Sequence, residues 1–102
     1  MRRASLRLQI AKAISEILPL GHKLSYANVR RYLTRDLLTQ YNIRRDTAIH
    51  SSDWLIAIQV AREERVARMR DGIPPGRLPS EDRLLKFLYS LFERDSNGNY
   101  VP

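Results

Sequence analysis

Residues 14–29, ISEILPLGHKLSYANV, decide the fold that we expect for this chain. The apolar residues before Pro19 recur every three or four positions, as they do on one face of a helix. Pro19 and Gly21 interrupt this pattern, because proline removes a backbone donor and glycine tolerates turns. Ser25 then offers a hydroxyl that can cap the next helix. The stretch therefore predicts two helices joined by a tight break.

The three-to-four periodicity continues along the chain and predicts an all-α protein of about four helices. The expected ranges are residues 5–18, 25–41, 47 or 53 to 71, and 80–94. The start of the third helix stays open, because five side chains that can cap a helix follow one another: Asp46, Thr47, Ser51, Ser52 and Asp53. Gly72 suits the end of that helix, and Ser80 suits the start of the last one.

Residues 73–79, IPPGRLP, predict a stiff connector before the last helix, since three prolines fix φ and remove donors. A chain of 102 residues suits one domain with one core. We expect that domain over residues 1–94, followed by a flexible C-terminal tail at 95–102. In the tail Asp95, Asn97 and Asn99 alternate as in a calcium loop. The glycine and the final glutamate that such a loop needs are misplaced or missing.

Charge is distributed very unevenly. Ten of the eighteen Lys and Arg residues lie in positions 1–45, against two acidic residues. That segment therefore carries +8, more than the formal +7 of the whole chain. The remaining residues sum to −1. A basic segment of this kind predicts a polyanion or an acidic protein as its partner.

The composition argues against an enzyme. The chain has no cysteine and only two histidines, so we predict no disulfide, no metal site and no cofactor. His50, Ser51, Ser52 and Asp53 hold the residue types of a hydrolase triad, but neighbours in sequence rarely face one another, and helix capping explains them better.

The first five residues lack the apolar block of a signal peptide, and no window is apolar enough to span a membrane. We therefore predict a cytoplasmic protein without membrane contact.

Nucleic-acid binding is the favoured function. The first two helices could form a helix-turn-helix, with arginines that neutralise phosphates. The candidates are Arg30, Arg31, Arg35, Arg44 and Arg45. The aromatic residues Tyr26, Tyr41 and Trp54 fit a core better than a base-stacking platform. We expect a small basic regulator of transcription or signalling that binds DNA.

The alternative is a protein adaptor that docks on an acidic partner without nucleic acid. The last helix has a broad apolar face, which must be buried on the core or on a partner. Its residues are Leu84, Phe87, Leu88, Leu91 and Phe92. A homodimer through this face is the form of self-association that we expect. At the other end of the chain, Arg2-Arg3-Ala4-Ser5-Leu6 matches a basophilic-kinase site at Ser5, beside the simpler reading of a solvated basic end.

Residues 14–25, ISEILPLGHKLS, followed by Val29 and Leu33, resemble the YmgB/AriR biofilm-development family over about residues 8–60. The resemblance implies an all-helical, dimeric connector that links two-component signalling to gene expression. The arginine-rich second helix, Leu38-Thr39, the connector and the last helix depart from that family. A fainter likeness, through Val29-Arg30 and Trp54, links the chain to KfrA-type plasmid DNA-binding domains.

Overall fold

The computed structural model describes residues 2–74, 76–91, 93–94 and 100–101, with backbone alone for the last four. Five helices make up the described fold: α1 (Arg3–Ile17), α2 (Tyr26–Tyr32), α3 (Arg35–Thr39), α4 (Ser51–Arg70) and α5 (Glu81–Ser90). β1 (Glu93–Arg94) and β2 (Tyr100–Val101) form a short antiparallel pair. The all-α prediction is confirmed, because the two short strands are the sole sheet in the described chain.

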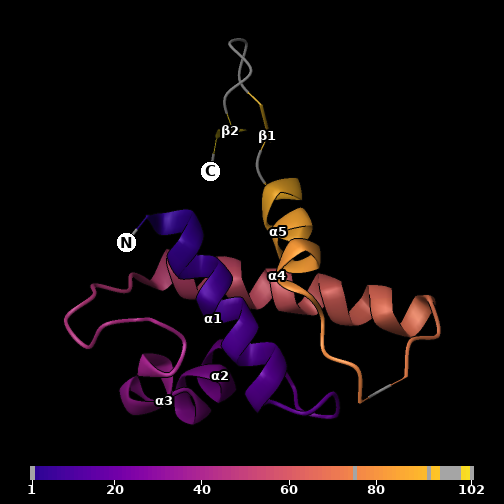
Figure 1. The fold of residues 1–102 in the computed structure, drawn as a ribbon, viewed down its shortest axis with the longest axis horizontal. Helices are drawn as coiled ribbons and strands as arrows, with labels where there is room; N and C mark the ends of the chain where they lie inside the picture. The colour runs from indigo at the N-terminus through magenta and orange to yellow at the C-terminus, as the bar shows by residue number, and fades with distance from the viewer. Residues whose placement is uncertain (1, 75, 92, 95–99, 102) are drawn as a thin grey trace.

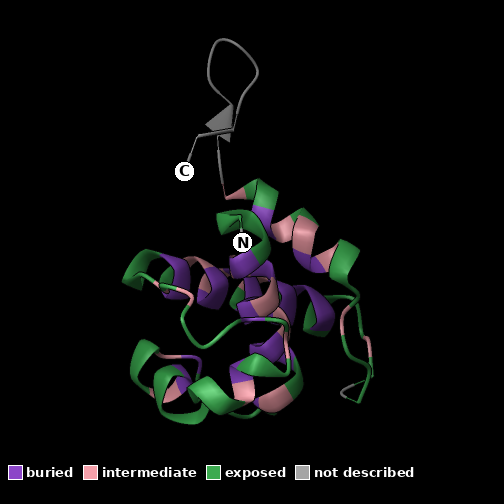
Figure 2. Cartoon of the chain, turned by 60° about the vertical axis from the view of Figure 1, so that its left-hand side comes forward, coloured by how far each residue is buried: buried purple, intermediate pink, exposed green. Residues whose placement is uncertain are grey.

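α4 is the central element of the fold. α1 and α5 both pack on it and on each other, and α2 contacts it as well (Figure 1). α2, α3 and the following loop lie toward the beginning of α4, whereas the connector leaves its far end (Figure 1). Buried residues gather where these helices meet, and α2 and α3 remain largely exposed (Figure 2).

The core uses one face of each long helix. Leu6, Ile10 and Ile14 of α1 meet Ile58 and Ala61 of α4 in a cluster that is almost completely shielded from solvent. Burying side chains of this size is the main source of stability in a small domain. The apolar stripe predicted before Pro19 therefore does face the core, apart from the half-buried Ile17.

The single helix predicted over 25–41 is wrong, because the chain leaves the helix at Leu33 and Thr34 and starts again as α3. The Thr34 hydroxyl accepts a hydrogen bond from the Leu37 amide at 3.3 Å and so caps the second helix. In α3 Leu38 is fully buried, whereas Leu37 is only partly buried.

The ends of the other helices follow local chemistry. α4 begins after His50, whose amide donates to the carboxylate of Asp53 at 2.9 Å, and ends before Gly72, which has a φ of 69°. Ser80 caps α5 as expected, by accepting from the Arg83 amide at 3.2 Å. α5 stops at Ser90 instead of 94, because the Leu91 amide bonds to Leu88 and tightens the last turn. The flexible tail was predicted over 95–102. Residues 100–101 of that range form β2, and residues 95–99 and 102 lie outside the described residues.

Candidate functional site

Six of the exposed Lys and Arg residues in the described chain lie in one part of the fold, residues 22–50, which we call the basic lobe. It comprises α2, α3, the turn before them and the loop to α4. The lobe holds six Lys or Arg residues against two acidic residues, a formal charge of +4. All five arginines predicted to contact phosphates lie in it and are exposed: Arg30, Arg31, Arg35, Arg44 and Arg45.

Two of these arginines help to build the lobe. The Arg30 guanidinium lies 4.9 Å from the centre of the Trp54 ring and 5.5 Å from that of Tyr26, whose hydroxyl accepts from it at 2.7 Å. Arg35 donates to the carbonyl of Thr47 at 2.8 Å and so ties α3 to the loop. Both side chains therefore stabilise the fold of the lobe, besides any contact with a ligand.

The other three arginines are less constrained. Arg44 lies 3.4 Å from Asp46 and its side chain is 82% exposed, while Arg45 pairs with Asp36 at the surface. Ion pairs that are this exposed are weak and are easily exchanged for another anion. Arg31 has no ion pair or hydrogen bond of its side chain within the described part of the chain. These three side chains are the ones best placed to meet an external anion.

The bases of α1 are neutralised from the second half of the sequence. Fully buried Asp53 accepts from Arg3 at 2.8 Å and from Arg7 at 2.9 Å. Glu81 pairs with Lys12 at 3.0 Å, and this hydrogen bond, followed by the charge of Glu81, raises the pKa of Lys12. These ion pairs neutralise much of the positive charge of α1 in the folded chain. Among the described residues, the basic lobe has no such compensation and keeps its excess of positive charge.

Three arginines of α4 donate to backbone carbonyls of other segments, and the sequence interpretation missed them; two of the three hold the start of the lobe and the turn before it. Arg62 donates to the carbonyl of Leu24, and Arg65 donates to the carbonyls of Leu18, Pro19 and His22. Burial lowers the pKa of Arg65, as does the nearby charge of Arg68, the third member. Arg68 reaches the carbonyl of Arg77 at 3.1 Å. Their regular three-residue spacing along one helix face was the signal that could have revealed them.

The apolar face of α5 is mostly used inside the chain. Leu84 and Leu88 are completely buried in the core, so they are not available to a partner, and the expectation of an interface there is corrected. Phe87 and Leu91 are half-buried against the same core. Phe92 lies outside the described residues. The broad face was identified correctly, but α1 and α4 cover its centre.

Exposed apolar side chains occur instead on α4. Leu55, Val66 and Met69 are 54%, 63% and 77% exposed and lie on the outer side of that helix. Within the described residues no helix is long and apolar enough to cross a membrane, and no group of three His, Asp or Glu residues could hold a metal ion.

Comparisons with protein-family models, with curated proteins and with solved structures find no match to this chain. The resemblances to the YmgB/AriR family and to KfrA-type domains therefore stay predictions.

Proposed function

We propose that this protein binds nucleic acid through the basic lobe and acts as a small regulator of transcription or signalling. The supporting observation is the charge distribution in the folded chain. Acids from the second half neutralise α1, yet the lobe keeps six bases against two acids, with Arg31, Arg44 and Arg45 open to solvent. Such a surface attracts a phosphate backbone and releases its counterions.

The size of the lobe's helices favours contact with phosphates over the reading of bases. α3 has five residues, which span only about 8 Å at the helical rise. A recognition helix in a helix-turn-helix lies in the major groove and presents several side chains to base edges. We therefore propose binding of low sequence specificity, in which arginines fix the position of the backbone.

Fluorescence anisotropy of a labelled random duplex, titrated with the protein at several salt concentrations, tests this function. We expect the logarithm of affinity to fall linearly with the logarithm of salt concentration. Arg31→Ala and Arg44→Ala should each reduce the slope by about one unit, because each removes one phosphate contact.

Arg70→Ala is the matched control. Arg70 is also an exposed arginine, with a side chain that is 72% exposed, but it lies at the opposite end of α4 from the lobe. The same loss of slope in this variant would mean that binding follows net charge and not the lobe. Absence of binding even at low salt would overturn the proposed function.

A protein adaptor is the second candidate, and the exposed apolar residues on the outer side of α4 favour it. Methionine is enriched in protein–protein interfaces, and Met69 is the most exposed of these residues. In that case Met69→Asp would abolish partner binding or self-association, whereas Arg31→Ala would leave both intact.

A further inference from the structure

We propose a second anion site, independent of the basic lobe, in the cavity between the connector and helices α4 and α5. We infer that it binds a small phosphate dianion, such as a phosphate monoester. The cavity has a volume of about 580 Å³, within the range of small-molecule sites. It is lined by Glu64, Arg68, Ile73, Arg77, Leu78, Pro79, Ser80, Asp82, Arg83 and Lys86.

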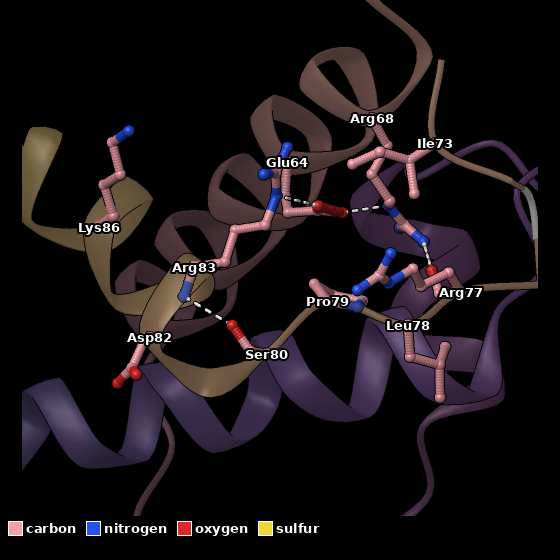
Figure 3. Close-up of a pocket in the computed structure, with 10 residues that line it drawn as sticks. All are labelled: Glu64, Arg68, Ile73, Arg77, Leu78, Pro79, Ser80, Asp82, Arg83 and Lys86. Atoms are coloured by element: carbon pink, nitrogen blue, oxygen red, sulfur yellow. Dashed lines mark hydrogen bonds and ion pairs between the residues drawn. The ribbon is translucent and has the colours of Figure 1, made fainter. Parts of the chain in front are cut away.

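The inner wall of the cavity is a buried cluster of charges. The Glu64 carboxylate is fully buried and contacts the Nε atoms of both Arg68 and Arg83, the second at 2.9 Å (Figure 3). Arg83 turns back from α5 toward Glu64, and Asp71 lies 3.5 Å from its other end. One carboxylate inside the cavity is therefore shared by two guanidinium groups.

Arg68 provides an observation of a different kind. Its side chain is only 4% exposed, and its Nη1 donates to the carbonyl of Arg77 at 3.1 Å. Its Nη2 is buried and has no hydrogen-bond partner among the described residues. A buried donor of a charged group is normally paired, because desolvation without a partner is costly. An oxyanion in the cavity would supply that partner.

Arg77 adds a third guanidinium from the opposite side. Its backbone is fixed by the Arg68 contact, and its side chain points from the connector back toward the cluster (Figure 3). Lys86 and Asp82 lie at the rim, point away from Glu64 and balance each other in charge (Figure 3). Among the residues that line the cavity, Glu64, Arg68, Arg77 and Arg83 sum to a formal +2, and Asp71, which lies outside the lining, offsets part of this charge through its pair with Arg83.

The positive lining favours a doubly charged ligand. A phosphate dianion is attracted more strongly by this set of guanidinium groups than a monocarboxylate is. Guanidinium groups also suit phosphate, because two parallel N–H donors can meet two of its oxygens. Ile73, Leu78 and Pro79 form an apolar side of the cavity that could hold a small organic group. Pro74 and Pro79 restrict the backbone of the connector and so pre-organise this wall for a ligand.

Isothermal titration calorimetry with phenyl phosphate, inorganic phosphate and benzoate at equal ionic strength tests the site. We expect both phosphates to bind and benzoate to bind at least about tenfold more weakly, since it is a monoanion. Tighter binding of phenyl phosphate would identify an organic monoester as the ligand, and equal binding would identify free phosphate. Either result supports a dianion site.

Arg77→Ala is the decisive variant, because its backbone contacts survive while its guanidinium is lost. We expect the affinity for phosphate to fall by about tenfold or more, in the range of one charged hydrogen-bonded contact. Arg70→Ala, which removes an exposed arginine outside the cavity, should leave the affinity unchanged. Arg77→Ala should also leave duplex binding by the basic lobe unchanged, which separates the two proposals.

Two results would overturn the site. One is the absence of binding heat for both phosphates up to about 10 mM at low salt, which excludes a functional affinity. The other is equal binding of phosphate by the wild-type protein and Arg77→Ala, which would place the anion elsewhere on the basic surface. Chemical shift changes in residues 73–86 on addition of phenyl phosphate provide an independent readout of the location.

Discussion

Asp53 shows how much one buried carboxylate can organise. Its two oxygens receive Arg3 and Arg7 from α1 and the amide of His50 at the start of α4. The residue thus caps one helix and neutralises another, although 46 positions separate it from Arg7. The sequence predicted a cap in this region but left five candidates open, since a cap is a local feature and the choice depends on α1.

Asp53→Asn tests this role. The amide can still cap α4, but it removes the buried negative charge that Arg7, whose side chain is 12% exposed, contacts at 2.9 Å. Removal of one partner from a buried ion pair is strongly destabilising, and we expect a loss of roughly 3 kcal/mol in the free energy of unfolding, measured with urea. Glu81→Gln is the control, because it breaks only the exposed pair with Lys12 and should cost less than about 1 kcal/mol. Equal losses in the two variants would contradict the role of burial.

Single residues also mark the limit of sequence reasoning about the site. The exposed arginines of the basic lobe were predictable, because their clustering is visible along the chain. The buried Glu64 and Arg68 were not, because the second half is nearly neutral and its charges looked solvated. Which charge is buried depends on the elements that cover it, and these come from distant positions.

At the scale of elements, helix existence was predictable and helix continuity was not. α1, α4 and α5 lie close to their expected ranges, since each has a long apolar period and a clear start or stop signal. The break between α2 and α3 has neither proline nor glycine. It depends on the Thr34 hydroxyl, whose competition with the helix is not visible in the apolar pattern.

Thr34→Ala should therefore weaken the join between α2 and α3. We expect a loss of about 1 kcal/mol in the free energy of unfolding, the usual value for removal of a capping hydroxyl. Thr34→Ser keeps that hydroxyl and should stay close to the wild type. Urea unfolding followed by circular dichroism gives both values. An unchanged stability in Thr34→Ala would show that tertiary contacts alone hold the break.

At the scale of the whole molecule, α1 is joined to two distant parts by groups that titrate at high pH. Burial raises the pKa of Tyr41 to about 12, with further contributions from its hydrogen bond to Glu16 and from that charge. Lys12 is bound to Glu81 on α5, and its pKa is raised as well. Both groups hold their protons more tightly in the folded chain than in the unfolded one.

The sign of the pH dependence follows directly. Tyr41 binds more protons in the folded state between pH 10 and about 12, so its contribution is complete below pH 10 and declines as pH rises through that window. We expect the urea midpoint of the wild type to fall more steeply there than that of Tyr41→Phe. Tyr32→Phe, which changes an exposed ring, should keep the wild-type slope. Parallel slopes in all three proteins would show that Tyr41 does not cause the pH dependence of stability.

The arginines of α4 have one more consequence, which concerns how the chain can be divided. Arg62 and Arg65 hold the backbone of residues 18–24, and Trp54 stacks on Arg30. A fragment that ends at residue 50 would retain every exposed arginine of the basic lobe and lose all of these supports. The exposed arginines of the lobe lie in the first half of the chain, whereas the side chains that hold the lobe in place come from the second half. We therefore expect that the basic half does not fold as an independent domain. A fusion protein that carries it alone would keep the positive charge but not the arrangement of the arginines.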